Sequence, residues 1–485
     1  MIKSKFLLFL LLFCSPVAMA QEQDKLLQLL KSELTYSMNE LKKQAQAPYY
    51  MNLRAMDDYT VNVTSSFGAI ASSRETRMRT LVPQVRLGSL ELDNFKYNSQ
   101  GAAQDPRRGN VSGVFLPLDD ETAEGIREAI WRETLKRYKF AQQQLEVSKT
   151  KATVSVEDED KAPCFSGVTA EKYYEAPLDG IDKIVDVAVW EKRLNEVSAV
   201  FKACPELQQG MANLTFQVYR TYLVSSEGAE VVQNRVSARV MLSASLKAAD
   251  GMVLPLNMDY FAYNPDELPG IDRMVADAKE MTRRLLALRD APVADPFTGP
   301  AILSGPASGV FFHEIFGHRI EGQRMKSESD GQTFKKMIGQ FVLPEGMHVY
   351  DDPTLRKYAG EDLNGFYKYD DQGVKAERVD VVVNGKLNDF LMTRTPIDGH
   401  PRTNGHARAS DGFDPVSRQS NLVIETSNPK TPEELRQLLI EEVKKQGKEY
   451  GYFFKEVTSG FTFTGKGGTN SFNVTPLEVY KVFAD

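Results

Sequence analysis

The chain has 485 residues, of which 42% are hydrophobic and 26% charged, and its formal net charge is −7. This composition is that of an ordinary soluble globular protein, and the length predicts two or three domains whose cores need no disulfide or metal for stability. A negative net charge without a basic tract argues against nucleic acid as a partner.

The first twenty residues have the features of a signal peptide. A positively charged start precedes an apolar run over residues 6–13, and the AMA sequence at 18–20 is a small-x-small cleavage site. Cys14 suggests a lipoprotein signal instead, but the residue before it is the bulky Phe13. The apolar run is too short to span a bilayer, and no later run of eighteen apolar residues follows. We therefore expect cleavage after Ala20 and an exported protein, periplasmic or secreted, without a membrane span.

The mature chain begins with segments typical of an N-terminal α+β domain, predicted to span residues 21–150. Periodic leucines predict an amphipathic helix over 24–45. Alternating polar and apolar residues predict antiparallel strands over 59–88. An acidic start at 118–122 predicts a long helix that continues to about Lys149.

A central α+β region is predicted over residues 151–295, beginning with a charged linker over 150–162. Apolar periodicity predicts its helices over 184–203 and 269–290, and its strands over 214–224 and 231–246. The proline-rich segment 291–296 then marks the start of a C-terminal domain, which we predict to span residues 296–485.

Two cysteines remain after the signal peptide, Cys164 and Cys204. In an oxidising compartment, two thiols forty positions apart indicate a disulfide, which we expect here. The alternative is a pair of buried free thiols. Neither cysteine has a neighbouring Cys or His in the sequence, so neither is expected to bind a metal.

The segment GPASGVFFHEIFGHRIEGQ, residues 305–323, contains the parts of a hydrolytic metal site. His313 and Glu314 are adjacent, and His318 follows after three residues. Neutral imidazole is a good zinc ligand, and an adjacent Glu can accept a proton from water that the metal activates. An apolar run and a small-residue turn precede the motif, which predicts a strand followed by a helix.

The spacing of the two histidines differs from that of the common zinc helix. In H-E-x-x-H the histidines lie four residues apart on one helix face. Here they are five apart, about 140° around an ideal helix. A π-bulge would bring them into register, and Gly317 could ease that distortion. The alternative is two ordinary histidines, but all 5 histidines of the chain lie after residue 312, which favours a site.

The motif and its surroundings resemble the TldD/PmbA metalloproteases, the microcin-processing peptidase type. The resemblance lies in GPAILSGPASGVFFHEIFGHRIEG (299–322), YDDQGVKAERVDVVVNGKLNDFLMTRT (369–395) and DGHPRTNGHARAS (398–410). It extends over roughly residues 297–485, while the first 290 match only loosely. It implies a zinc endopeptidase with His313 and His318 as ligands and Glu314 as the general base.

The C-terminal domain is predicted to be mainly antiparallel. Asn384-Gly385 predicts a hairpin between strands at 379–383 and 386–392, because both turn positions take positive φ. Further strands are expected over 460–464 and 471–484. The family resemblance implies a barrel-like domain. The expected fold class is therefore α+β, with a mixed N-terminal region and a β-rich C-terminal domain that carries the metal-site helix.

The family resemblance also implies a third zinc ligand, a cysteine beyond the strand that PLEVYKVFAD resembles. This sequence has no cysteine after Cys204 and ends at Asp485, so we expect the family's extreme C-terminal segment to be lacking. The chain is then a truncated version, completes its site differently, or is inactive. Glu321, His400 and His406 are the candidates for a third ligand within the chain.

The loop from residue 398 to 410 is either a plain solvated loop or a substrate-binding element. In the second interpretation Arg402, His400 or His406 contacts the backbone or a carboxylate of the substrate near the metal.

Two functions are compatible with these observations. The first is an exported zinc-dependent metallopeptidase that hydrolyses peptides or unfolded polypeptides, held as an added strand in a β-rich cleft. The second is a catalytically impaired TldD/PmbA-like partner subunit or a peptide-binding module. In both cases we expect a homo- or heterodimer with a family member.

The predicted signal peptide can be tested directly. The mature protein should begin at Gln21, so Edman sequencing of the exported protein should start there. An intact Met1 or a lipid-modified Cys14 would contradict the expected export route.

Overall fold

The computed structural model describes residues 21, 23–96, 113–119, 121, 123–153, 160–294, 296–327, 330–466 and 471–484. The predicted signal peptide, residues 1–20, lies outside this part of the chain. Among the described residues, no helix combines the length and the apolar character needed to cross a membrane.

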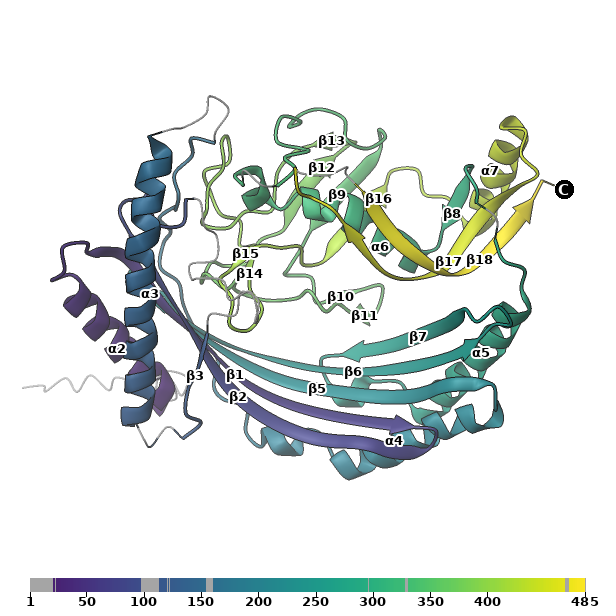
Figure 1. Cartoon of the computed structure of the whole chain (residues 1–485), viewed down its shortest axis with the longest axis horizontal. Coiled ribbons are helices and arrows are strands. Elements are labelled where there is room, and N and C mark those ends of the chain that lie inside the picture. Colours follow the sequence, from purple (N-terminus) through teal and green to yellow (C-terminus); the bar gives the residue numbers. More distant parts are fainter. Residues whose placement is uncertain are drawn as a thin grey trace, which may run out of the picture.

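A long, curved, seven-stranded sheet forms the base of the molecule (Figure 1). Its order is β3-β2-β1-β5-β6-β4, and β7 also pairs with β6. The strands are β1 (Pro48–Ser66), β2 (Ala69–Leu87), β3 (Val114–Phe115), β4 (Lys172–Tyr174), β5 (Leu207–Ser225), β6 (Glu230–Lys247) and β7 (Val253–Ala262). All neighbours pair antiparallel except β4 and β6.

The sheet joins regions that the sequence suggested were separate. β1 pairs with β5 from Asn52 opposite Ser225 to Ser66 opposite Met211. Strands from 21–150 and from 151–295 therefore belong to one sheet, and the domain boundaries at 150 and 295 stay predictions. The strands expected over 59–88, 214–224 and 231–246 are confirmed, each beginning earlier than predicted.

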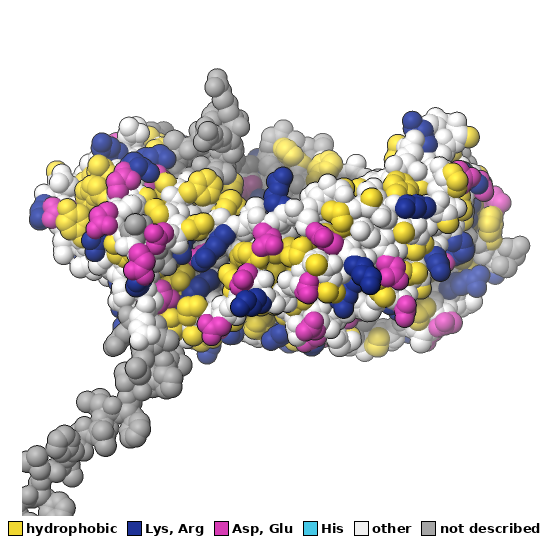
Figure 2. Space-filling view, turned by 90° about the horizontal axis from the view of Figure 1, so that it is seen from below, with side chains coloured by type: hydrophobic (Ala, Val, Ile, Leu, Met, Phe, Trp, Pro, Cys, Tyr) yellow, Lys and Arg dark blue, Asp and Glu magenta, His cyan; other side chains and the backbone are white. Residues whose placement is uncertain are grey.

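Two helices cover the outer, convex face of the sheet, α4 (Val187–Ala199) and α5 (Ile271–Asp290) (Figure 1). Alternate residues of β5, including Leu214 and Phe216, are fully buried in one core with Leu194 of α4 and Met281 of α5. This two-residue period is the one expected for a strand with one face against helices. Figure 2 shows basic and acidic side chains interspersed over this outer side of the molecule.

A second helical pair, α2 (Lys25–Leu41) and α3 (Ala123–Ala152), packs at the other end of the sheet. Asp24 caps α2 by accepting from the Leu27 backbone N at 3.1 Å. The leucines that predicted this helix are buried in a core shared with β1, β2 and α3: Leu26, Leu27, Leu29, Leu30 and Leu34. Both predicted helices are confirmed.

The C-terminal region lies over the concave face of the sheet (Figure 1). Its helices are α6 (Gly305–Ile315) and α7 (Pro432–Lys445). Its longer strands are β8 (Ala301–Leu303), β9 (Met347–Asp351), β12 (Val379–Val383), β16 (Leu422–Thr426), β17 (Tyr450–Thr462) and β18 (Phe472–Phe483), and its two-residue strands are β10 (Lys357–Tyr358), β11 (Glu361–Asp362), β13 (Lys386–Leu387), β14 (Ala407–Arg408) and β15 (Val416–Ser417).

The α+β class is confirmed, but the described C-terminal strands do not close into a barrel. They form separate sheets, β13-β12-β9-β16, β18-β17-β8, β10-β11 and β14-β15. The predicted hairpin is present, with φ of 49° at Asn384 and 80° at Gly385. Its second strand ends at Leu387, because Leu391 instead donates its backbone N to Ile320 O at 2.9 Å, which ties this segment to the metal motif.

The predicted disulfide is wrong, because Cys164 and Cys204 are both free and buried. Cys204 belongs to the core beneath α4 and α5, and its Sγ lies 3.2 Å from Glu206 Oε2. Cys164 lies elsewhere, with its Sγ 3.2 Å from the Glu91 carbonyl oxygen. Burial raises the pKa of the Cys164 thiol to about 11, so this thiol is held in its unreactive protonated form.

When mature protein prepared without reductant is unfolded, both free thiols should therefore become exposed to solvent. We expect a thiol reagent to label two cysteines per chain in denaturant, and a reducing agent to leave the melting temperature unchanged. A disulfide would contribute about 2–4 kcal/mol, so a fall in melting temperature on reduction would contradict the free-thiol assignment.

Candidate metal centre

Helix α6 carries the first two residues of the motif, and its start is fixed by local sequence. Ser304 caps it by accepting from the Ala307 backbone N at 3.2 Å, and Pro306 occupies the first turn. β8 pairs in parallel with Tyr452–Phe454 of β17, and α6 then packs along β17. Gly460 of β17 faces the motif so closely that a Cβ there would lie 3.3 Å from Glu314 Cγ.

The two histidines meet because α6 ends between them. The helix stops at Ile315, and a 3-10 turn over Gly317–Arg319 carries His318 back toward His313. Their ring centroids lie 4.6 Å apart at an interplanar angle of 74°. The predicted π-bulge is therefore wrong, since the five-residue spacing is accommodated by a helix end.

Gly317 is needed for space rather than for backbone distortion. It does not have a positive φ, but a Cβ at this position would lie 1.9 Å from Gln419 Oε1. Arg319, which is buried, stabilises the helix end by donating from Nη1 to Glu314 O at 3.0 Å and to Ile315 O at 2.7 Å. These contacts satisfy carbonyls that the end of a helix otherwise leaves unpaired.

The side chains of His313, Glu314 and His318 form one cluster. One ligand atom from each lies within 4.8 Å of the others. The Glu314 carboxylate is 3.9 Å from Nε2 of each imidazole. Glu314 and His318 are 9% and 13% exposed at the side chain, whereas His313 is 45% exposed, so the cluster is reached from the His313 side.

The surroundings of His313 favour the neutral imidazole, which is the form that binds metals. Burial lowers the pKa of His313 from its ordinary value, and the neighbouring His318 lowers it further against the opposing effect of Glu314. Imidazole nitrogens and carboxylate oxygens are donors that zinc accepts. The residues present therefore fit a zinc ion.

Glu321, a candidate third ligand, instead orients His318. Its side chain is 1% exposed, and its Oε1 lies 3.0 Å from His318 Nδ1 while its Oε2 accepts from Arg324 Nε at 2.6 Å. Burial opposes ionisation of Glu321, but His318, Arg418 and Arg324 outweigh it and lower its pKa. A carboxylate on Nδ1 fixes the tautomer and leaves Nε2 of His318 directed at the cluster.

The other two candidate ligands are engaged elsewhere. His406 is fully buried, with its Nε2 3.2 Å from Asp351 Oδ1 and its Nδ1 2.9 Å from Asn404 O. His400 directs Nδ1 at Asp389 Oδ1, 2.7 Å away. Among the described residues the structure thus places neither histidine, nor Glu321, in the cluster. Hydrogen-bond partners hold each of them in this structure, and the expectation that one of them is a third ligand stays a prediction.

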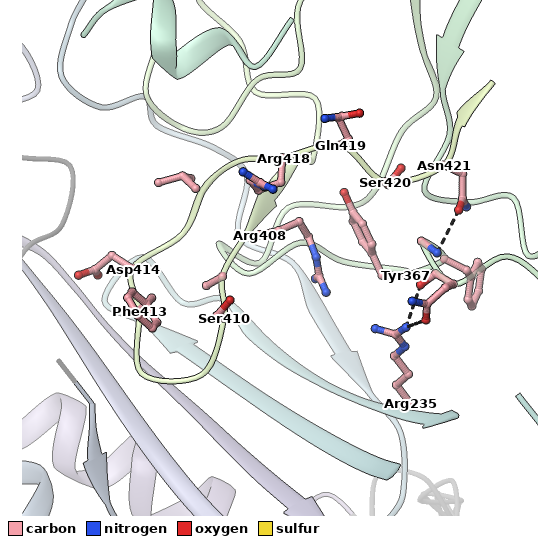
Figure 3. A pocket seen from close by; sticks show the side chains of 15 residues that line it. Arg235, Tyr367, Arg408, Ser410, Phe413, Asp414, Arg418, Gln419, Ser420 and Asn421 are labelled. Carbon is pink, nitrogen blue, oxygen red and sulfur yellow. Dashed lines mark hydrogen bonds between the residues drawn. The ribbon is translucent and has the colours of Figure 1, made fainter. Parts of the chain in front are cut away.

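The predicted substrate contact Arg402 is exposed on its loop, and its role stays a prediction. Two residues that sequence reasoning missed lie closer to the motif. Arg418 Nη1 is 3.6 Å from Glu321 Oε1, and the Gln419 amide packs on Gly317. Both line a cavity of about 740 Å³ (Figure 3). Neither belongs to a motif, so the sequence carried no signal for them.

Comparisons with known proteins identify relatives of the C-terminal region. The PmbA/TldA metallopeptidase C-terminal domain matches residues 297–476. A metalloprotease of Archaeoglobus fulgidus is 31% identical over 160 residues, which are 33% of this chain and 35% of the relative. A zinc metalloprotease TldD homolog of Saccharolobus solfataricus is 23% identical over 230 residues, 45% of this chain and 48% of the relative. The matches thus span less than half of these curated relatives.

The fold as a whole has a counterpart among solved structures. The crystal structure of TldE from Thermococcus kodakarensis superposes with a TM-score of 0.59 at 13% identity, over 94% of this chain and 88% of that one. At this identity the likeness concerns the fold alone.

The role of Glu321 predicts a measurable loss of metal affinity. Glu321→Gln keeps the shape but removes the charge that holds His318, so zinc affinity, measured by chelator competition, should fall about 10–100-fold. Glu377→Gln, an exposed change in the same region, should bind zinc like the parent. Equal affinity in all three proteins would show that Glu321 does not support the metal centre.

Proposed function

We propose that this chain, which belongs to the TldD/PmbA family, is an exported zinc-dependent metallopeptidase that hydrolyses peptides or unfolded polypeptides. The observation that supports this most directly is the His313–Glu314–His318 cluster, whose ligand atoms converge within 4.8 Å. Export rests on the features of residues 1–20 in the sequence.

His313 and His318 would hold the zinc ion through imidazole nitrogens. Nε2 is the nitrogen available on His318, because Glu321 engages Nδ1. Zinc supplies Lewis acidity when bound, which lowers the pKa of water and polarises a scissile carbonyl. The role of the two imidazoles is to fix its position at the end of α6.

Glu314 is the general base of the proposed reaction. Its carboxylate lies 3.9 Å from Nε2 of each imidazole, and its side chain is largely buried against Gly460 of β17. In the proposed reaction it accepts the proton of the attacking water and passes it to the leaving amine. The small residue at position 460 leaves room for this side chain.

A catalytically impaired partner subunit or peptide-binding module is the alternative for this chain. It would keep the fold and bind peptides without cleaving them. Pairing with a second family member, as a homo- or heterodimer, is part of the proposal in either case.

The proposal is tested by Glu314→Gln, which keeps the shape of the side chain but cannot accept a proton. Zinc content should be retained while peptide cleavage falls about 10²–10⁴-fold, the usual contribution of a general base. Zinc is measured by atomic emission on the mature protein, and cleavage with a quenched fluorescent peptide.

Glu433→Gln, an exposed change on α7, serves as the matched control and should cleave like the parent. Full activity of Glu314→Gln would remove Glu314 as the base. A parent protein that binds zinc and peptide but cleaves nothing would favour the impaired subunit.

A further inference from the structure

The cavity beside the metal cluster has a positively charged lining. Its charged residues are three arginines, Arg235, Arg408 and Arg418, and one carboxylate, Asp414. Asp414 is buried and already ion-paired with the buried Arg137 at 3.0 Å. Arg418 lies 3.6 Å from Glu321 and Arg408 lies 3.3 Å from Asp371, so among the described residues Arg235 is the arginine of this lining that no carboxylate pairs with.

Arg235 is incompletely satisfied. It projects from β6, and its Nη2 donates to Asn364 O at 2.8 Å. Its Nε is buried and has no hydrogen-bond partner, and no carboxylate pairs with this guanidinium within the part of the chain that the structure describes. A buried donor without an acceptor carries a desolvation cost that a ligand can relieve.

Arg408 approaches the same space from the opposite side. It belongs to β14 in the C-terminal region, and Figure 3 shows its guanidinium directed toward the sheet from which Arg235 rises. It is held over the Tyr367 ring, 4.3 Å from the centroid, and its Nη1 is 3.3 Å from Asp371 Oδ2. Burial lowers the pKa of Arg235 and the charge of Arg408 lowers it further, so the two guanidinium groups act on each other.

The two arginines lie where two cavities meet. Both also line a larger cavity of about 1050 Å³, whose other charged residues are the cations Arg54, Arg356 and Lys368 and the carboxylates Glu175, Asp371 and Asp411. The smaller cavity reaches the metal motif through Gln419, which packs on Gly317. A peptide that occupied these cavities would have one part near the cluster and another beside Arg235 and Arg408.

We propose that Arg235 and Arg408 form a carboxylate-binding subsite that holds an anionic group of the peptide substrate. The group is the C-terminal carboxylate or an acidic side chain, since both present the planar pair of oxygens that guanidinium forks bind best. This inference rests on the proposed peptidase function, because it places the remainder of the peptide at the metal cluster.

The test measures binding rather than cleavage, so that it is separate from the test of catalysis. Zinc-loaded Glu314→Gln protein, which should bind peptides without cleaving them, is titrated with four fluorescent peptides. Two have a free C-terminal carboxylate and two are amidated there, and each pair has one member with an internal Glu and one with an internal Gln. Arg235→Gln or Arg408→Gln is then introduced into the Glu314→Gln protein. Either change should weaken binding of the carboxylate-bearing peptide about 10–100-fold, which corresponds to the loss of one hydrogen bond to a charged group. The matched neutral peptide should bind as before.

Which peptide loses affinity identifies the source of the carboxylate, the C-terminus or the side chain, and either result supports the subsite. Arg436→Gln, an exposed change on α7, should alter none of the affinities. Should a Gln variant fail to fold, Arg235→Lys or Arg408→Lys keeps the charge but loses the fork, and should weaken the same peptide selectively.

Binding of all four peptides with equal affinity, unchanged by the arginine variants, would overturn the subsite while leaving the peptidase proposal intact. Failure of the zinc-loaded protein to bind any of the peptides would overturn both.

Discussion

The hydrogen bonds from Arg319 to the carbonyls of Glu314 and Ile315 hold the end of α6 between the two histidines. On a continuous helix these imidazoles would point about 140° apart. With the helix ended and the next turn wound as 3-10, the two rings meet edge to face with their centroids 4.6 Å apart. The chemistry of the centre thus depends on a helix C-terminus, where backbone groups need partners from outside the helix.

A chain of charges continues from this helix end into the C-terminal region. Glu321 is almost fully buried, a position that an ionised carboxylate tolerates only with partners. His318 and Arg418 lie beside its Oε1, while Arg324 pairs with its Oε2. Because Arg418 also lines the cavity, the same residue balances the charge behind His318 and borders the space beside it.

Local features of the chain were predictable because local sequence causes them. Periodic leucines predicted α2, and the Asn384-Gly385 pair predicted a hairpin whose turn residues have positive φ. The family resemblance and the histidine pattern together pointed to His313, Glu314 and His318 as a cluster, which the structure brings within 4.8 Å.

The predictions that failed concern features that depend on residues distant in the sequence. The five-residue spacing is met by a helix end, and the side chain that packs on Gly317 there is Gln419, about a hundred positions away in the sequence. His406 could be excluded from the cluster only once Asp351 was seen against its Nε2. The cysteine pair failed for the same reason, since nothing near Cys164 or Cys204 indicates which part of the fold will bury it.

The segment between Arg408 and Gln419 is what joins the two halves of the molecule at the site. Its middle is anchored to the N-terminal half, because Asp414 pairs with Arg137 of α3 and the Phe413 carbonyl accepts from Arg54 of β1. Removing one partner of such a buried ion pair typically costs 3–5 kcal/mol. The end of the segment contacts the metal motif, since Gln419 packs on Gly317. The curved sheet is therefore more than a support: through this segment its position is coupled to that of the histidine turn, and it contributes Arg235 to the cavity beside the cluster.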